Sequence, residues 1–279
     1  KTASCDQNHH FDRARQGYYN LLLSNQKQSS NPGDSKEMIR ARSAFLSEGH
    51  FLPLAETLAT NLERLIGSVN LLDCGCGDGY YSHHLKSALV RTERVGEVCG
   101  IDISKDALRM AAKQYPGVDF AVASNFNQPF MNAQANLIIQ VFAPADALEV
   151  KRVLAESGEL WVVSPGPQHL WELRRALYRT PTPHEMPRGI PGFEQIVQDQ
   201  LEYTFNLDNN NAIRNLLKMT PYFWQAPLRG RETVLALTEL ELSADFIITR
   251  YQKSAPEIAE ELEEQQAIDE GSGEKNLDV

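Results

Sequence analysis

A glycine-rich, acidic loop is the segment of this sequence best suited to hold a small molecule. Residues 73–79 read Asp-Cys-Gly-Cys-Gly-Asp-Gly and directly follow the apolar run 69–72. Glycine has no side chain, so the backbone of such a loop can approach a ligand closely. In open α/β sheets, ligands bind in the crevice at the carboxyl ends of the strands. The pattern therefore predicts a ligand site where this apolar run ends.

The spacing and charge of the loop indicate which ligand it suits. Gly75, Gly77 and Gly79 follow the pattern G-x-G-x-G, whereas dinucleotide sites follow G-x-G-x-x-G. Asp73 would repel a pyrophosphate and attract the ammonium group of S-adenosylmethionine. Asp102 ends the next apolar run, where a carboxylate can accept hydrogen bonds from both ribose hydroxyls. The set indicates S-adenosylmethionine and disfavours a nicotinamide oxidoreductase. The alternative is that the glycines only form a tight turn and that Asp102 only caps a helix.

The cysteines and one asparagine allow two interpretations. Cys74 and Cys76 have a C-x-C spacing like that of some metal sites, but inside this loop they are interpreted as small apolar filler. Together with Cys5 and Cys99 they form no disulfide framework, which indicates reduced thiols and a cytoplasmic enzyme. Asn125 follows a predicted strand and suits either the adenine edge of the ligand or an ordinary loop.

Apolar runs alternate with helical segments through the middle of the chain. Strands are predicted at 69–73, 98–101, 120–123, 137–141 and 159–163. Helices are predicted at 80–89, 104–114 and 145–154, with a turn at 157–158. This alternation predicts the doubly wound α/β class, a parallel sheet with helices on both faces.

The flanking segments complete the predicted organisation. Two helices, broken at Pro53, precede the first strand. After residue 165 come a helix at 169–178, a proline-rich loop at 181–191, helices at 211–217 and 232–237, and a closing antiparallel pair of strands at 202–207 and 246–251. The chain therefore divides into a small module and linker (1–33), the α/β domain (34–255) and an acidic, disordered tail (256–279).

Most of the net charge of −10 lies in that tail. It holds nine acidic residues against Lys275, which leaves −2 for the rest of the chain. A nearly neutral body can carry a basic face, and eight arginines are clustered enough to form one, although they also suit an ordinary solvated surface. These are Arg40, Arg42, Arg174, Arg175, Arg179, Arg188, Arg229 and Arg231. The tail itself suits a solubilising end or an internal mimic of RNA. No apolar run could span a bilayer and no signal sequence is seen, so no membrane partner is expected.

Longer motifs resemble one family, the bacterial 23S rRNA guanine-N1 methyltransferases with an N-terminal zinc-binding module. The resemblance covers nearly the whole chain except the tail, and its most particular stretches are those after residue 164. The matching stretches are Cys5 with residues 9–12, then 17–22, 32–38, 41–42, 45–46, 49–51, 73–81, 142–144, 165–173 and 219–224.

The resemblance implies a class I S-adenosylmethionine-dependent methyltransferase fold with a partial zinc-finger-like module. It also implies which residues grip the cofactor. Besides the loop residues, these are Phe51, Tyr81, Ser82 and His169. His169 lies beyond the carboxyl end of a predicted strand, where active sites of open sheets gather; without the resemblance it reads as a helix cap or a surface residue.

The zinc module departs from the family pattern. Family members carry a C-x-x-C pair ahead of a cysteine and a histidine, which together close a tetrahedral site. This sequence has only Cys5 and His9 in that arrangement. Zinc is therefore expected only if an upstream cysteine pair is supplied, and the alternative is a module that binds no metal.

The resemblance further implies methylation of N1 of a guanine in a hairpin loop of domain II of 23S rRNA, by a homodimer. N1 carries a proton at neutral pH, so the proton must leave and the base must be extracted from its loop. Phe142 and Pro144 follow the fourth strand and are the predicted target-base pocket; no proton acceptor can be named. Arg13, Arg15 and Lys27 form the predicted RNA-reading surface, with a lid over the cofactor as the alternative.

Two other functions suit parts of the sequence. The same loop would serve a methyltransferase for a small molecule or a protein side chain. A non-catalytic RNA-binding relative is the second alternative, and the complete set of loop residues with Asp102 counts against a decayed cofactor site.

Overall fold

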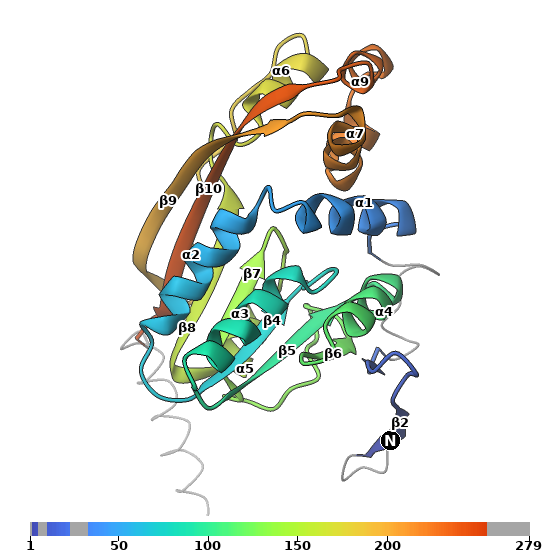
Figure 1. Ribbon diagram of the computed structural model, residues 1–279. Helices are drawn as coiled ribbons and strands as arrows, with labels where there is room; N and C mark the ends of the chain where they lie inside the picture. Colours follow the sequence, from blue (N-terminus) through green and yellow to red (C-terminus); the bar gives the residue numbers. More distant parts are fainter. Residues whose placement is uncertain (1, 5–9, 23–32, 256–279) are drawn as a thin grey trace, which may run out of the picture.

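An eight-stranded mixed sheet forms the centre of the computed structural model, which describes residues 2–4, 10–22 and 33–255 (Figure 1). The strand order is β3-β6-β5-β4-β7-β8-β10-β9. The strands are β3 (Tyr19–Asn20), β4 (Val69–Cys74), β5 (Gly96–Asp102), β6 (Asp119–Val122), β7 (Ala135–Val141), β8 (Leu154–Pro165), β9 (Phe193–Leu207) and β10 (Leu240–Lys253).

The chain direction changes only at one side of the sheet. Strands β3 to β8 pair in parallel, whereas β10 is antiparallel to both β8 and β9. The winding reverses at β4, because the chain moves outward through β5 and β6 and then returns to β7 on the other side. Such a reversal opens a crevice at the carboxyl ends of the strands. The predicted doubly wound sheet and its closing antiparallel pair are confirmed.

Side chains of each central strand alternate between two apolar layers. Leu71 and Ile139 belong to the larger core, which also contains residues of α2, α3 and α4, whereas Leu72 and Ile138 face the smaller core with α5. Figure 1 shows α2, α3 and α4 in front of the sheet and α6, α7 and α9 gathered beyond its upper end. The helices are α1 (Lys36–Ser47), α2 (Leu52–Glu63), α3 (Tyr80–Arg91), α4 (Lys105–Gln114), α5 (Ala147–Val153), α6 (Trp171–Leu177), α7 (Asn210–Met219), α8 (Tyr222–Gln225) and α9 (Leu228–Leu235).

Helix α1 forms a roof between the sheet and α7. It begins at a capping Ser35, whose hydroxyl accepts a hydrogen bond from the Met38 amide at 3.2 Å. Figure 1 shows α1 lying above the upper ends of the central strands and below α7. Lys218 of α7 and Glu37 of α1 form an ion pair at 2.6 Å. The two helices therefore close over the crevice together.

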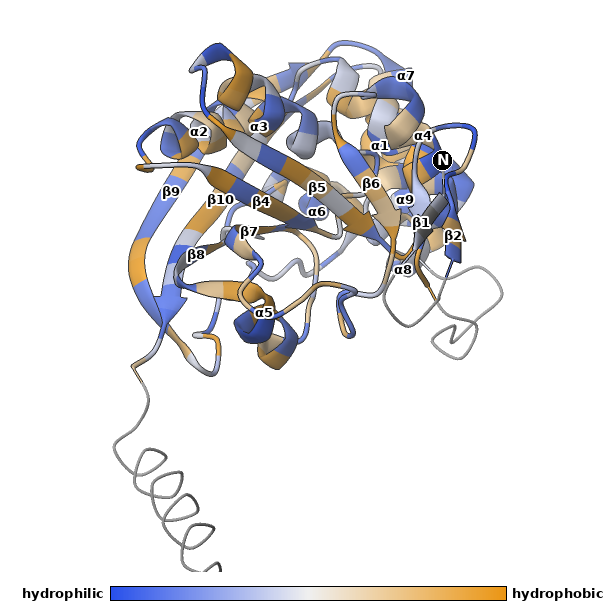
Figure 2. Ribbon diagram, turned by 90° about the horizontal axis from the view of Figure 1, so that it is seen from below, coloured by the Kyte–Doolittle hydropathy of each residue, from blue (hydrophilic) through white to orange (hydrophobic). Residues whose placement is uncertain are grey.

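Several predicted elements differ from the structure in their bounds, and strand β10 also begins at Leu240 instead of 246. The expected turn at 157–158 lies inside β8, where the pairing with β7 shifts register. Strand β9 begins at Phe193, nine residues before the predicted 202, and the one-turn helix α8 was missed. Figure 2 shows this outer strand coloured largely as hydrophilic. Because β9 lies at the edge of the sheet and is mostly exposed, its first half lacks the apolar alternation that marks a strand.

The described part of the N-terminal region joins the main sheet. Strands β1 (Thr2–Ser4) and β2 (His10–Asp12) form an antiparallel pair, and β3 adds to the edge of the sheet beside β6. Tyr18 and Leu22 are buried in the larger core. The boundary at residue 33 stays a prediction, and the acidic tail lies outside the described residues.

Candidate active site

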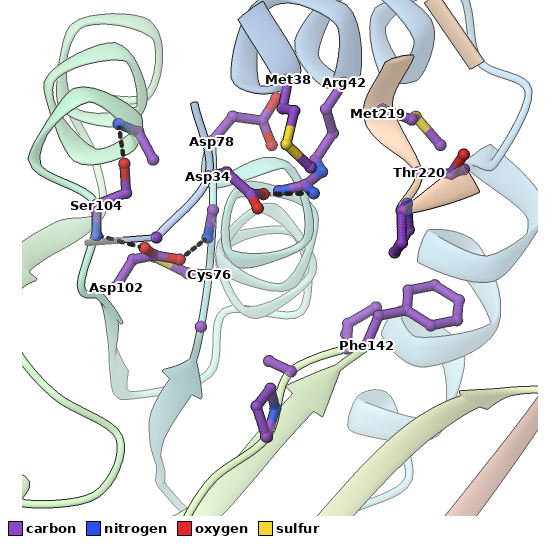
Figure 3. Close-up of a pocket in the computed structure, with 18 of the residues that line it drawn as sticks. Asp34, Met38, Arg42, Cys76, Asp78, Asp102, Ser104, Phe142, Met219 and Thr220 are labelled. Carbon is purple, nitrogen blue, oxygen red and sulfur yellow. Dashed lines mark hydrogen bonds and ion pairs between the residues drawn. The ribbon is translucent and has the colours of Figure 1, made fainter. Parts of the chain in front are cut away.

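A cavity of about 730 Å³ opens at the carboxyl ends of β4, β5 and β7, beneath α1 and the α7–α8 segment (Figure 3). Of the eleven residues proposed for the cofactor and the target base, nine line it. These are Phe51, Asp73, Gly75, Gly77, Tyr81, Asp102, Phe142, Pro144 and His169. The other two, Gly79 and Ser82, lie behind the wall. The volume lies within the range of small-molecule sites in proteins.

Two glycines of the loop, Gly75 and Gly79, have no room for a side chain. Gly75 has φ +78°, and a Cβ there would lie 2.4 Å from the Cβ of Ala143. Gly79 has φ +80° and begins α3, where a Cβ would lie 2.7 Å from the ring of Phe120. Gly75 therefore shapes the cavity, while Gly79 serves the turn into the helix and its packing against the sheet.

Asp102 joins the glycine loop to the start of α4. One carboxylate oxygen accepts the Gly77 amide hydrogen at 3.0 Å and the other accepts the Ser104 amide hydrogen at 2.7 Å (Figure 3). Burial raises the pKa of this carboxyl, and the two amides oppose that shift. Each carboxylate oxygen can accept a further hydrogen bond. Asp102 can therefore hold the loop and bind a ligand hydroxyl at once.

Asp73 is a buried acid at the bottom of the cavity. Its carboxylate accepts a hydrogen bond from the Ser82 hydroxyl at 2.5 Å. Burial raises its pKa to about 7, with Ser82 acting in the opposite direction and Asp102 and Asp78 adding to the rise. Ser82 thus positions the carboxylate from behind. A cationic ligand group beside Asp73 would favour the charged form of the acid.

An ion pair on the roof was not predicted as part of the site. Arg42 of α1 and Asp34 pair at 2.6 Å, and both line the cavity with Met38 (Figure 3). Arg42 falls within one of the matched family stretches. Its role was missed because the packing of α1 over the glycine loop is set by contacts that no local spacing encodes.

Asn125 has one polar atom left free beside the cavity. Its amide nitrogen donates to the Pro144 carbonyl at 3.1 Å. Its side-chain oxygen is buried and has no hydrogen-bond partner among the described residues. A buried acceptor without a partner costs free energy, and a ligand N–H would remove that cost. Asn125 therefore suits the adenine edge, one of its two predicted roles.

His169 lies among aromatic rings at the other side of the cavity. Its ring centroid is 5.8 Å from that of Phe51, 5.7 Å from that of Phe142 and 4.8 Å from that of Phe246. Its Nδ1 accepts the Asp245 amide hydrogen at 3.3 Å. Burial lowers its pKa to about 3, so the ring is neutral and carries its proton on Nε2. His169 can donate one hydrogen bond from Nε2.

Two residues beside this ring cluster have strained backbones. Phe142 has φ +54° and Leu170 has φ +52°, values that a bulky residue rarely adopts. Both line the cavity, and the Phe142 side chain is 46% exposed. Strain of this kind clusters at active sites, where the surrounding fold holds it in place. The aromatic face of Phe142 is thus available to a planar ligand.

The aromatic end also contains a pair that sequence reasoning missed. His184, in the proline-rich loop, and Tyr222, at the start of α8, both line the cavity. His184 Nε2 and the Tyr222 hydroxyl lie 3.0 Å apart. Tyr222 falls within the matched stretch 219–224, but no spacing connects it with a residue 38 positions earlier.

The cysteines at the site behave as packing residues. Cys74 and Cys76 are free thiols, buried, and their pKa values are raised by burial. Among the described residues, no group of three or more histidine, cysteine or acidic side chains could hold a metal ion. The proposed zinc ligands Cys5 and His9 lie outside those residues.

Comparison with known proteins gives a consistent result for both parts of the chain. Residues 67–218 match a methyltransferase-domain family, and residues 1–30 match the N-terminal RlmA zinc-ribbon family. The 23S rRNA (guanine(748)-N(1))-methyltransferase of Streptomyces fradiae is 35% identical over 90% of this chain and 91% of its own length. The chain belongs to the 23S rRNA guanine-N1-methyltransferase family.

Two further relatives carry names that assign the same activity provisionally. YxjB of Bacillus subtilis strain 168 is 33% identical over 87% of this chain and 86% of its own length. The protein of Micromonospora griseorubida is 32% identical over 88% of this chain and 89% of its own length. Membership of the family agrees with the strand order, which carries a class I methyltransferase sheet with an added edge strand. No helix in the described part of this family member is both long and apolar enough to cross a membrane.

Proposed function

We propose that this protein transfers a methyl group from S-adenosylmethionine to N1 of a guanine in a hairpin loop of domain II of 23S rRNA. The observation that carries the proposal is a single cavity with two chemically different ends. One end has the glycine loop, Asp73 and Asp102; the other has exposed Phe142 and a ring cluster. A cofactor and an unpaired base can occupy these ends and meet between them.

The residues of the first end fit S-adenosylmethionine. Gly75 leaves no room for a Cβ, Asp102 presents a carboxylate for ribose hydroxyls, and Asn125 has an unpartnered oxygen for an adenine N–H. Asp73 would face the ammonium group of the methionine part. S-adenosylmethionine supplies its methyl group from a positively charged sulfur, so no protein nucleophile is needed.

The second end fits a base taken out of an RNA loop. Enzymes that modify a base extract it and read it between apolar or aromatic surfaces. Phe142 and Pro144 would hold the guanine, and His169, which the resemblance assigns to the cofactor, would donate from Nε2 to the cofactor beside them. Trp224 lies exposed next to cavity-lining Tyr222 and Gln225, where it can stack on a neighbouring loop base.

Other contacts with the RNA follow from the N-terminal region. Arg13 and Arg15 are exposed there, so they can meet the phosphate backbone; Lys27 lies outside the described residues. The match of residues 1–30 to a zinc-ribbon family supports zinc at Cys5 and His9 if two further ligands are supplied. A homodimer and a cytoplasmic location, as expected for an enzyme acting on ribosomal RNA, belong to the same proposal.

The test is methyl transfer from labelled S-adenosylmethionine to unmodified 23S rRNA, with the product nucleoside identified. Guanine 748, named for the Streptomyces fradiae relative, is the first position to examine. Wild-type protein should form 1-methylguanosine and Asp73→Ala should not, while Asp199→Ala, on the exposed edge strand, should match wild type. Cofactor binding without rRNA methylation would favour the small-molecule or protein alternative. Absence of cofactor binding would favour a non-catalytic relative.

A further inference from the structure

The hydrogen-bonded pair of His184 and Tyr222 lines the second end of the cavity, which the proposed function assigns to the guanine. The ring of His184 neighbours the ring of His169, which neighbours that of the target-base residue Phe142. The His184 ring centroid is 6.4 Å from that of His169, which in turn is 5.7 Å from that of Phe142. All four residues line the same cavity.

The fold holds both members of the pair in place. The His184 amide donates to the Pro167 carbonyl at 3.2 Å, which ties the proline-rich loop to the segment before α6. Tyr222 begins α8 directly after Pro221, and its ring packs edge-on against Tyr178 with centroids 6.3 Å apart. A hydrogen bond between two independently anchored residues is a preorganised feature.

The surroundings keep His184 neutral and Tyr222 protonated. Burial lowers the pKa of His184 first, the positive charge of Arg174 lowers it further, and the carboxylate of Asp245 acts in the opposite direction. Burial raises the pKa of Tyr222. Arg174 is only 9% exposed and packs over the ring of Trp171. With His184 as the Nδ1–H tautomer, the tyrosine hydroxyl donates to its Nε2 across the 3.0 Å contact, and the tyrosine oxygen keeps a lone pair for a ligand hydrogen.

The carboxylates of the cavity already have partners at its first end, where the Asn125 oxygen also lies. Asp102 binds two backbone amides in the glycine loop, Asp73 binds Ser82, and Asp34 pairs with Arg42. His169 has its acceptor nitrogen occupied by a backbone amide. These acids lie at the first end of the cavity, whereas His184 and Tyr222 lie among the rings of the second.

We propose that Tyr222 and His184 form a proton relay that deprotonates guanine N1 during methylation, a step that rests on the proposed function. N1 bonds to the methyl carbon as the bond from that carbon to sulfur breaks, and its electron pair stays on sulfur. The N1 proton passes to the Tyr222 oxygen while the tyrosine proton passes to His184 Nε2. The products are neutral 1-methylguanine, a neutral thioether and a histidinium ion, so charge is conserved.

A weak base is sufficient for this step. As the methyl group bonds to N1, the positive charge on the base grows and the N1–H bond becomes far more acidic. The acceptor then needs only to be unprotonated and correctly placed when the bond forms. Because Arg174 disfavours histidinium, the relay also returns its proton to water readily after each turnover.

The experiment measures single-turnover methylation of 23S rRNA by Tyr222→Phe and His184→Ala. We expect the rate to fall about 10²–10⁴-fold, the usual contribution of general base catalysis. Affinity for S-adenosylhomocysteine, measured by calorimetry, should stay within about threefold of wild type, as expected for residues outside the cofactor end. Tyr115→Phe and His83→Ala are matched controls, because neither residue lines the cavity or contacts the pair.

Two readouts separate proton transfer from a structural role. Added imidazole should restore part of the activity of His184→Ala but not of Tyr222→Phe. The wild-type rate should fall as the pH drops through the pKa of His184, which lies below 6.5, and this acidic limb should disappear in His184→Ala.

The outcomes distinguish the relay from the proposed function. If wild-type protein makes no 1-methylguanosine, the proposed function fails and the relay fails with it. If wild-type protein is active and both variants keep its rate, the relay is wrong and the function stands. A rate loss with an equal loss of S-adenosylhomocysteine affinity, and no rescue by imidazole, assigns the pair a structural role and overturns the relay.

Discussion

The two ends of the cavity are built in different ways. The glycine-loop end comes from one β-α-β unit, with Asp73, Gly75, Gly77 and Asp102 set by the ends of β4 and β5. The ring end combines Phe142 with residues from three other segments. These are His169 before α6, His184 before β9 and Tyr222 in α8. A general ligand site can thus be encoded locally, whereas the site that selects a substrate depends on how distant segments pack. Variants at the glycine-loop end should therefore lose cofactor affinity, whereas variants at the ring end should lose RNA binding or methyl transfer.

The largest effect is expected at Gly75. Gly75→Ala should lower the affinity for S-adenosylmethionine at least about 100-fold, because the new Cβ would lie 2.4 Å from Ala143 in a backbone with positive φ. Isothermal titration calorimetry measures the affinity of each variant for S-adenosylmethionine. Gly67→Ala is the matched control, since Gly67 also has positive φ but no atom within 4 Å of the added Cβ.

A double variant sharpens this prediction. Ala143→Gly removes the obstructing methyl group and should restore part of the affinity lost in Gly75→Ala. If Gly75→Ala binds the cofactor as tightly as Gly67→Ala does, the close approach of the two walls plays no part in binding.

The next effect is expected at Asp102. Asp102→Ala should lower cofactor affinity about 10–100-fold, because it removes a buried acceptor and leaves the Gly77 and Ser104 amides without their partner. RNA affinity, measured by fluorescence anisotropy, should stay unchanged. A parallel loss of RNA affinity would show that the two ends are not independent.

A pH effect is expected at Asp73. Its pKa is raised to about 7 in the folded protein, so folding takes up a proton between about pH 4 and pH 7. The stabilisation from protonated Asp73 is complete below the unfolded pKa near 4 and is lost as the pH rises through 7. The free energy of unfolding should therefore fall across this window in wild type, and less so in Asp73→Asn.

The same pKa affects cofactor binding with the opposite sign. An ammonium group needs the charged carboxylate, so affinity should rise as the pH approaches 7 from below, by up to about tenfold per pH unit. Calorimetry in buffers of different ionisation enthalpy should detect proton release on binding. Equal affinity at pH 5 and pH 7 would contradict a contact between Asp73 and the ammonium group.

The smallest effect is expected at the rim of the ring end. Trp224 is 57% exposed beside cavity-lining Tyr222 and Gln225. Trp224→Ala should weaken RNA binding about tenfold by removing one stacking surface, with no change in cofactor affinity. Ile66→Ala is the control, because Ile66 is 98% exposed and does not line the cavity. An equal loss in both variants would remove Trp224 from the RNA contact surface.

The doubly wound sheet and most of the first end of the site can be predicted from the amino-acid sequence alone. Apolar runs alternating with helical segments predict that sheet, and the loop 73–79 with Asp102 lies at the ends of adjacent strands. These features depend on neighbours in the chain, and a β-α-β unit always brings the ends of its parallel strands to one edge. The expectations for Phe51 and His169 came from resemblance and not from spacing.

The remaining features of the site depend on how distant segments of the chain pack together. Gly79 and Ser82 belong to the same loop and helix as the cavity residues, yet the turn of α3 directs them behind the wall. Arg42, His184 and Tyr222 reach the cavity because α1, the proline-rich loop and α8 fold over the sheet. Such placement depends on the burial of apolar side chains between distant segments, which leaves no period in the sequence of the residues it brings together.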